Sequence, residues 1–383
     1  MKKIRVLEMI DQAFLGGGQR HVLSLVKSLS PEKFQVAVGS EAGGPLVEEL
    51  KNWGIRHYSL QMGKSSFLRN RNEILSLLKK AQFDILHTHG GVAGLFGRLA
   101  ACQSRIPVVV HTLHGIHYLH YRNPFLRKIF VLMERWLSRR TDAVIFVSQD
   151  DRIKGSRLKL VPEEKIIFIP NGIDFQKYSL DEETWQKAKK RKKNFNLPES
   201  KLIIGTVARL HRQKGLIYFF QAARILLNQR QDICFVIAGG GPLEKKFRNY
   251  LQRKKLENFI FLLGETGKTQ ELYPLFDVFV LPSLWEGLPY ALLEAAAFER
   301  PVIGTNIDGI RELLKPGETG LLVPPEDSLS LAEAILKWLN KPEMAEEMGR
   351  KLREDLSRRY SLERMVQETE ELYLRLCREK GIY

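Results

Sequence analysis

The sequence is poor in cysteine and contains no long apolar run. Its 383 residues include only Cys102, Cys234 and Cys377, which lie far apart. Such an odd, scattered set makes neither a disulfide framework nor a zinc knuckle, and it favours a reducing, cytoplasmic compartment. No run approaches the roughly 20 apolar residues of a membrane-spanning helix. The opening segment, MKKIRVLEMI, is interrupted by charges at Arg5 and Glu8, so we expect a buried strand there instead of a signal peptide.

The usual phosphate-binding motifs are absent as well. Three glycines, Gly16 to Gly18, follow the first apolar run, but they match neither G-x-G-x-x-G nor G-x-x-x-x-G-K-[ST]. They suit either a plain strand-to-helix turn or a backbone that approaches an anion at a helix start. No D-x-D motif occurs, which argues against a diphosphate bridged by a metal ion.

The charge is strongly positive and unevenly distributed. The net charge is +16, and residues 1–174 carry 26 Lys and Arg against 15 Asp and Glu. A basic half suits nucleic acid, an anionic membrane surface or anionic substrates, and composition does not choose among them.

Short β-branched runs alternate with amphipathic helical patterns along the whole chain. This alternation predicts an α/β fold with parallel sheets covered by helices on both faces. The predicted strands are Ile4–Met9, Phe34–Gly39, Asp84–Thr88, Val108–Thr112, Ala143–Val147, Ile166–Ile169, Ile203–Val207, Cys234–Ala238, Ile260–Leu263, Val278–Leu281 and Pro301–Gly304. The predicted helices include Arg20–Leu29, Asn72–Lys80, Leu216–Asn228 and Ser328–Trp338.

The chain is longer than one ordinary core, so we expect two domains. Segment 175–200 replaces apolar periodicity with charge and is the predicted linker. It separates a doubly wound domain at 1–174 from a second at 201–361. Ligands of such folds bind beyond the carboxyl ends of the strands, in a cleft expected between the two domains.

Histidines are concentrated in the first half, with six of nine between His87 and His120. His87 and His89 share one face at the end of a predicted strand, and His-x-His spacing suits zinc. Few carboxylates lie nearby and no H-E-x-x-H motif occurs, so we expect no metal site. His114 follows a strand and precedes a glycine, where it can contact a substrate, whereas His111 is expected to pack or to support a neighbour.

Two segments of the second half combine charge with the start of a helix. In GTVARLHRQKGL, Arg209 and Lys214 follow a strand. The planar guanidinium of Arg209 beside the mobile ammonium of Lys214 suits a diphosphate. In SLWEGLPYALLEAAAF, Glu286 lies in a turn and Pro289 fits the first position of a helix that contains Glu294. A buried carboxylate is costly without a partner. The two glutamates beside a diphosphate site therefore predict a nucleotide sugar.

The sequence resembles the retaining glycosyltransferases of family 4, which have the GT-B fold. Glu286 and Glu294 match the E-x7-E signature of that family, and further matches follow in family order along nearly the whole chain. They are the Gly16–Gly18 turn, HTHGG, HTLHG, IPNGID, VARLHRQKG, IAGGGP, PVIGTNIDGIREL and GETGLLVPPED. The resemblance implies two Rossmann-like domains with an interdomain cleft, and a final helical segment, 362–383, that packs back on the first domain.

The resemblance also implies residue roles. Arg209 and Lys214 hold the donor diphosphate in place of a metal ion. Glu286 binds the transferred sugar, with His114 beside it, and Glu294 binds the ribose. The other donor contacts are Gly17, Gly18, Leu263, Gly264, Leu288, Pro289 and Tyr290, and the acceptor contacts are Gln19 and His89. No cofactor is expected, because the nucleotide sugar is a substrate, and a UDP-sugar is favoured over a GDP-sugar.

Two positions depart from the family pattern. Many relatives have glutamate where this chain has Gln19, and Gly-Gly where it has Asp308 and Gly309. Both places concern recognition of the sugar or the acceptor. The resemblance further implies a reaction on one face of the sugar, in which the leaving phosphate helps to deprotonate the acceptor.

The basic first half contains the segment HYRNPFLRKIFVLMERWLSRR. On a helix, Phe125, Ile129, Met133 and Trp136 share one face, with cations mostly on the other sides. This stripe can lie on an anionic membrane or pack on the first sheet, and amphipathicity alone favours packing in the core. We still expect the basic half to attach the enzyme to the inner membrane face. The expected acceptor is a glycan or lipid-linked hydroxyl in envelope polysaccharide, lipopolysaccharide or glycolipid synthesis.

Two other classes of function fit the sequence less well. A nucleotide-sugar epimerase or hydrolase on the same fold would need catalytic carboxylates that the matched motifs do not provide. A nucleic-acid-binding protein is suggested by charge alone. The basic segment KKRKKNF at 189–195 is typical of a solvated linker, so we expect no nucleic-acid partner.

Overall fold

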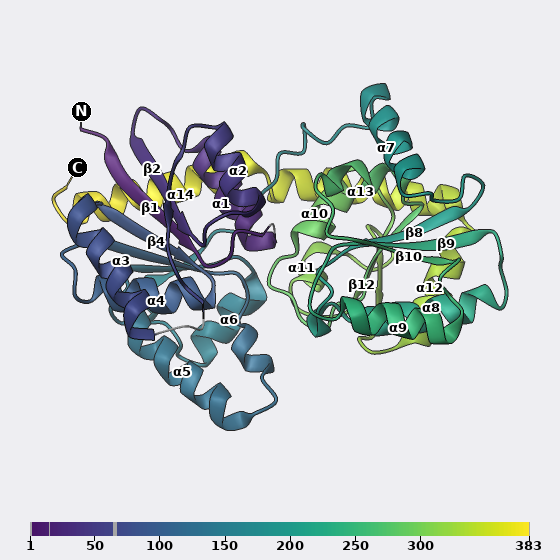
Figure 1. The fold of residues 1–383 in the computed structure, drawn as a ribbon, viewed down its shortest axis with the longest axis horizontal. Coiled ribbons are helices and arrows are strands. Elements are labelled where there is room, and N and C mark those ends of the chain that lie inside the picture. Colours follow the sequence, from purple (N-terminus) through teal and green to yellow (C-terminus); the bar gives the residue numbers. More distant parts are fainter. Residues whose placement is uncertain (1, 15, 64–66, 383) are drawn as a thin grey trace. The chain divides into compact units, whose positions relative to one another are not determined.

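The computed structural model describes residues 2–14, 16–63 and 67–382, and it contains two parallel sheets (Figure 1). Contacts divide the chain into two compact units, Met1–Gly172 with Leu362–Tyr383, and Ile173–Ser361. In each unit parallel strands alternate with helices. The prediction of two doubly wound, Rossmann-like domains is confirmed.

The first unit is built on a seven-stranded sheet with the order β3-β2-β1-β4-β5-β6-β7. Its strands are β1 (Ile4–Ile10), β2 (Phe34–Ser40), β3 (Arg56–Ser59), β4 (Ile85–His89), β5 (Val108–Leu113), β6 (Ala143–Phe146) and β7 (Ile166–Phe168). Its helices are α1 (Gly17–Ser28), α2 (Gly44–Asn52), α3 (Phe67–Ala81), α4 (Gly91–Ala101), α5 (Pro124–Ser138), α6 (Gln149–Arg157) and α14 (Leu362–Glu379). The edge strand β3 was not predicted, because its polar residues form no apolar run.

The second unit is built on a six-stranded sheet with the order β10-β9-β8-β11-β12-β13. Its strands are β8 (Leu202–Val207), β9 (Ile233–Ala238), β10 (Ile260–Gly264), β11 (Val278–Leu281), β12 (Val302–Thr305) and β13 (Leu321–Val323). Its helices are α7 (Glu182–Asn194), α8 (Leu216–Leu227), α9 (Glu244–Lys254), α10 (Tyr290–Ala297), α11 (Ile310–Leu313), α12 (Ser328–Leu339) and α13 (Pro342–Arg359).

Each sheet has one point where the strand order changes direction. In the first unit β1 pairs with both β2 and β4, and in the second β8 pairs with both β9 and β11. Loops that leave the carboxyl ends of two such strands diverge to opposite faces, which makes this point the usual ligand site of doubly wound sheets. The glycine turn follows β1, His89 ends β4, and the segments of Arg209 and Glu286 follow β8 and β11.

The charged segment 175–200 is not an extended linker. It forms α7, whose first turn is capped by the Asp181 side chain accepting from the backbone N–H of Thr184 at 2.8 Å. Arg191 of α7 pairs with Glu271 at 2.6 Å, and Ala188 is buried. Segment 175–200 therefore belongs to the second unit, as a helix with one attached face and several solvated sides.

The last helix, α14, completes the core of the first unit. In Figure 1 it is the yellow helix beside β1 and β2. Its buried residues, which include Met365, Leu372 and Leu376, share one hydrophobic cluster with Ile4 and Val108. Residues from both ends of the chain thus form one core.

Helix α5 differs from the prediction made for its apolar stripe. Its buried side is Glu134, Leu137 and Ser138, and Glu134 receives two hydrogen bonds from Arg98 of α4, at 2.7 and 2.8 Å. Of the predicted stripe, Phe125, Ile129 and Trp136 are exposed and Met133 is half-buried, and Leu126 and Leu132 are exposed as well. The expectation that this stripe packs in the core is wrong, because a buried ion pair attaches the helix by its other side.

The described residues contain no helix that is both long enough and apolar enough to cross a bilayer.

Candidate active site

A glycine turn opens helix α1 at the carboxyl end of β1. Gly16 is the residue before the helix, and its N–H donates to Oε1 of Gln19 at 3.1 Å. The side-chain nitrogen of Gln19, Nε2, donates to the carbonyl oxygen of Gln12 at 3.0 Å. Gln19 is therefore buried and shapes the turn, while an acceptor contact through it stays a prediction.

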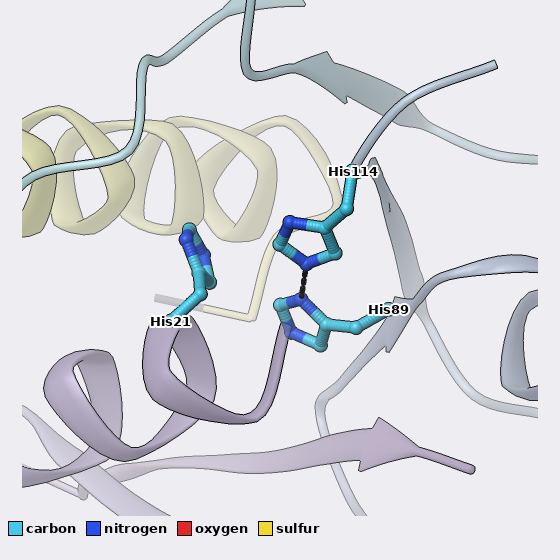
Figure 2. A group of neighbouring side chains, drawn as sticks. All are labelled: His21, His89 and His114. Carbon is cyan, nitrogen blue, oxygen red and sulfur yellow. Dashed lines mark hydrogen bonds between the residues drawn. The ribbon is translucent and has the colours of Figure 1, made fainter. Parts of the chain in front are cut away.

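Three histidines meet beyond the ends of β4 and β5 (Figure 2). His89 ends β4, His114 follows β5, and His21 comes from α1. Nδ1 of His89 lies 3.2 Å from Nε2 of His114, and the rings of His21 and His114 meet edge to face with centroids 4.9 Å apart. A methyl group on Gly18 would lie 3.5 Å from Cδ2 of His114, so the glycine turn packs on the same ring. The predicted residues of the first half are thus brought together: Gly17, Gly18, Gln19, His89 and His114.

These three histidines are uncharged at neutral pH. Burial, aided by the neighbouring histidines, lowers the pKa of His89 to about 4 and that of His21 to about 3. The same causes hold the pKa of His114 well below its ordinary value. A neutral imidazole carries one N–H and one lone pair, so each ring offers one donor and one acceptor.

His89 is fully buried, with 0% of its surface exposed. Its Nδ1 contacts His114 and its Nε2 lies 2.7 Å from Oε2 of Glu8. The predicted direct contact of His89 with an acceptor does not fit this burial. The prediction for His111 fits better, because this residue packs against Thr88. Its ring also lies so close to position 94 that only a glycine fits there.

Two groups of described residues have donor atoms close enough to hold a metal ion. One is His21, His89 and His114, and the other is Glu8, His87 and His89, each with its atoms within 4.8 Å of one another. The second group is fully buried. The sequence did not predict His21 or Glu8 as part of either group, since neither lies near the histidine-rich segment.

In the second unit the structure pairs two of the predicted catalytic residues directly. Nζ of Lys214 donates to Oε1 of Glu286 at 2.5 Å. The same carboxylate accepts from Oγ of Ser283 at 2.6 Å and from Nε2 of Gln213 at 3.3 Å. Arg209 follows β8 in the same loop as Lys214 and is exposed. Sequence reasoning missed Ser283 and Gln213, although both lie beside matched motif residues.

Glycines allow the loops around this pair to touch. Gly215 has φ +58°, and a methyl group there would lie 1.9 Å from the carbonyl oxygen of Pro282. Gly309 has φ +73°, and a methyl group there would lie 1.7 Å from the carbonyl oxygen of Gly287. The loops after β8, β11 and β12 therefore pack backbone to backbone, which fixes Lys214 against Glu286.

Glu294 lies in α10, where 2% of its surface is exposed. Oη of Tyr273 donates to its Oε2 at 2.6 Å. Helix α10 begins at Tyr290, one residue later than predicted, and Pro289 is the residue before it. Pro289 thus ends the Glu286 loop, and Leu288 and Tyr290 on either side of it are buried.

Leu263 and Gly264 lie at the end of β10, and Gly264 has φ +71°. One strand, β9, separates β10 from β8. The structure therefore gathers Arg209, Lys214, Glu286 and the start of α10 near one point and places the pair Leu263–Gly264 farther along the same sheet edge.

Two family models match the chain and together span most of it. The model described as Glycosyltransferase Family 4 matches residues 15–177. The model described as Glycosyl transferases group 1 matches residues 187–355. The first range includes the glycine turn and the histidine cluster, and the second includes the Lys214–Glu286 pair.

Relatives match over nearly the full length. The chain is 29% identical over 380 residues to the UDP-Gal:alpha-D-GlcNAc-diphosphoundecaprenol alpha-1,3-galactosyltransferase of Escherichia coli, covering 97% of both chains. It is 27% identical over 320 residues to the capsular polysaccharide biosynthesis glycosyltransferase CapM of Staphylococcus aureus, covering 82% of both. Among solved structures, HepE of Anabaena in complex with UDP-glucose matches with a TM-score of 0.83 at 19% identity, covering 97% of this chain and 99% of HepE.

The packing of the Lys214 loop predicts unequal effects of two glycine substitutions. Gly215 and Gly317 both have positive φ, but no atom lies within 4 Å of the methyl position of Gly317. Gly317→Ala should lower the free energy of unfolding by about 1–2 kcal/mol, the cost of a left-handed residue. Gly215→Ala should lower it by about 3 kcal/mol or more, because the Pro282 backbone must also move. Calorimetric unfolding of both variants measures the difference, and equal losses would contradict the close packing.

Proposed function

Because this chain belongs to the family 4 type of glycosyltransferases with the GT-B fold, we propose that it transfers a sugar from a UDP-sugar to a hydroxyl group of a lipid-linked or glycan acceptor. The reaction retains the anomeric configuration and serves the synthesis of a cell-envelope polysaccharide. The observation that carries this proposal is the Lys214–Glu286 pair at the switch point of the second sheet, beside the exposed Arg209.

The choice of donor and acceptor is supported by the relatives. The Escherichia coli relative is named for UDP-galactose and for an acceptor on diphosphoundecaprenol, and CapM is named for capsular polysaccharide. HepE was solved with UDP-glucose. A UDP-sugar is therefore the first donor to test and a GDP-sugar the second. An epimerase or hydrolase is not favoured, since no relative named above has such an activity.

The cations account for departure of the nucleotide. Breaking the bond between the anomeric carbon and the phosphate oxygen leaves negative charge on the diphosphate and positive charge on the sugar ring. Arg209 can bind the diphosphate through its planar fork, and Lys214 can move from Glu286 to the phosphate. This positive charge replaces a divalent ion, so we propose a metal-independent reaction.

The carboxylates bind hydroxyl groups instead of attacking the sugar. Glu286 is held by Ser283 and Gln213, which keep it oriented when Lys214 turns to the phosphate. It then accepts from hydroxyls of the transferred sugar, while Glu294 accepts from the ribose. The acceptor oxygen bonds to the anomeric carbon on the face that the phosphate leaves. The acceptor proton goes to the departing phosphate oxygen, so no protein nucleophile is needed.

Nucleotide affinity tests the ribose role of Glu294. We expect calorimetry to show binding of UDP in preference to GDP and ADP, without added metal ions. Glu294→Gln keeps the shape and an acceptor for Tyr273 but loses the charge. It should weaken UDP binding about 10- to 100-fold, the effect of losing charge-assisted hydrogen bonds.

Glu333→Gln is the matched control, because Glu333 is an exposed carboxylate on α12 of the same unit. It should leave the affinity unchanged. Equal UDP affinity of wild type and Glu294→Gln would remove the ribose role from this residue.

Product stereochemistry tests the transfer itself. With a UDP-hexose and a short lipid-diphosphate sugar as acceptor, proton NMR should show that the new glycosidic bond has the anomeric configuration of the donor. Addition of EDTA should leave the initial rate unchanged. A product of inverted configuration would exclude the reaction on one face, and a rate abolished by EDTA would exclude the metal-independent proposal.

Helix α5 supports a membrane-bound acceptor. Its exposed apolar residues form one stripe, with Phe125 70% and Trp136 42% exposed. Lys128 and Arg140 lie beside this stripe, and the guanidinium of Arg140 lies 4.0 Å from the centroid of the Trp136 ring. A helix with apolar residues outward and cations around them fits an anionic lipid surface. The excess positive charge of residues 1–174 also favours binding to an anionic lipid surface. We therefore propose peripheral attachment to the inner membrane face through α5.

Vesicle binding tests the role of this helix. Wild type should sediment with vesicles that contain phosphatidylglycerol more than with phosphatidylcholine alone, and added salt should weaken the binding. Phe125→Ser combined with Trp136→Ser should lower the affinity at least about tenfold, through lost apolar burial. Leu329→Ser, which changes an exposed leucine of the second unit, is the control and should have no effect. Equal binding to both kinds of vesicle would refute the proposal.

A further inference from the structure

Three histidine rings from three separate elements converge in the first unit. His21 lies in α1, His89 ends β4 and His114 follows β5. Each ring offers one nitrogen atom, and these three atoms all lie within 4.8 Å of one another (Figure 2). His21 and His89 are buried and His114 is half-buried, so His114 forms the side of the cluster nearest to solvent.

The spacing of the rings suits a tetrahedral metal ion. Zinc binds histidine nitrogen at about 2.0–2.1 Å, and tetrahedral geometry then places two ligand nitrogens about 3.4 Å apart. Nδ1 of His89 and Nε2 of His114 are already 3.2 Å apart. This pair therefore spans one edge of such a tetrahedron, and a rotation of the His21 side chain completes a set of three ligands.

The outer nitrogens of two of these rings contact oxygen atoms. Nε2 of His89 lies 2.7 Å from Oε2 of Glu8, and Nδ1 of His21 lies 3.0 Å from Oδ1 of Asn171. Glu8 and Asn171 are both buried. A histidine that binds a metal ion almost always donates its other ring N–H to a carboxylate, a carbonyl or water, which turns its second nitrogen toward the ion. The cluster thus has the outer contacts of a metal site as well as the inner nitrogens.

The neighbouring group of possible ligands is less suited to an ion. It consists of Glu8, His87 and His89 and is fully buried. Nδ1 of His87 contacts Oη of Tyr373, and its Nε2 contacts Oγ1 of Thr112. Both nitrogens of His87 are therefore engaged by protein hydroxyls, and an ion is better placed between the three rings.

Three imidazoles also change the expectation drawn from the sequence. A metal ion was disfavoured because few carboxylates lie near the histidine-rich segment and the H-E-x-x-H spacing is absent. A site of three histidines needs neither feature, and His21 comes from outside that segment. Imidazole is a common ligand of zinc, and three protein ligands leave the fourth position to water.

We propose that His21, His89 and His114 bind one Zn²⁺ ion, with a water molecule in the fourth position. Glu8 and Asn171 are positioning residues that hold two of the ligand rings. The ion has no part in the proposed sugar transfer, for which the second unit supplies the cations.

A bound ion has a consequence for that reaction. It occupies Nε2 of His114, a ring expected to lie beside the transferred sugar. Zinc should therefore inhibit transfer reversibly. This consequence rests on the proposed function, whereas the binding of zinc does not.

Cobalt binding to the full chain tests the site without any assay of activity. Protein without a histidine tag is dialysed against EDTA and then against metal-free buffer, and Co²⁺ is added. We expect the intense visible absorption of tetrahedral cobalt to saturate at one equivalent, and Zn²⁺ to displace it. Absence of this absorption together with absence of heat on calorimetric titration with zinc would overturn the proposal.

X-ray absorption of the zinc-loaded wild type identifies the ligands directly. We expect three histidine nitrogens and one oxygen, at about 2.0–2.1 Å. Sulfur ligands, at about 2.3 Å, would place the ion on a cysteine and would refute the site.

Variants assign the binding to these residues. His21→Gln should weaken zinc binding more than about 100-fold, and Asn171→Ala, which removes only an outer contact, about 10- to 100-fold. His120→Gln is the matched control, because His120 is an exposed histidine that also follows β5. It should keep the wild-type affinity. Unchanged affinity in a folded His21→Gln or Asn171→Ala protein would contradict the assignment.

Kinetics test the inhibition separately. Saturating Zn²⁺ should abolish sugar transfer by the metal-free wild type, and excess EDTA should restore the initial rate. Asn171→Ala should need about 10- to 100-fold more zinc for the same inhibition. Equal sensitivity of the two proteins would show that zinc inhibits from elsewhere. Absence of transfer by the metal-free wild type would refute the proposed function and leave the cobalt result standing.

Discussion

The buried carboxylate of Glu8 is the constraint around which the first unit is organised. An ion without water is costly, and removing one partner of such an ion is strongly destabilising. The fold supplies those partners from β4, where His87 and His89 lie, and from α14, where Tyr373 lies. The central strand, its neighbour and the last helix are therefore held together by one charge as well as by the apolar core.

The same buried carboxylate also supports the residues at the carboxyl edge of the sheet. Glu8 contacts His89, and His89 contacts His114, so the buried carboxylate supports the histidines at the carboxyl edge of the first sheet. In the second unit the loops are held together in a different way. Its glycines have no side chain, so loop backbones can touch at Pro282 and Gly287. In both units the candidate site residues are held in place by neighbours that are buried.

Helix α5 shows how one local contact changes the role of an amphipathic segment. A sequence pattern gives the width of an apolar stripe but not what the stripe faces. The bidentate pair between Arg98 and Glu134 attaches to α4 the side of α5 that also buries Leu137, and it leaves the stripe of Phe125 and Trp136 outward. Arg98 and Glu134 lie on different helices, 36 residues apart in the chain, so no local pattern identified the pair in advance.

The sequence by itself determined the α/β class, most strands, the two-domain division and the loops that hold Arg209, Lys214 and Glu286. These features depend on short-range patterns, on periodicity, on glycine and proline, and on motif spacing. The tertiary structure alone decided that Lys214 contacts Glu286, that Tyr273 contacts Glu294, and that Glu8 lies behind His89. Such partners are brought together by strand order and by the return of α14. Side chains far apart in the chain meet only in the folded structure.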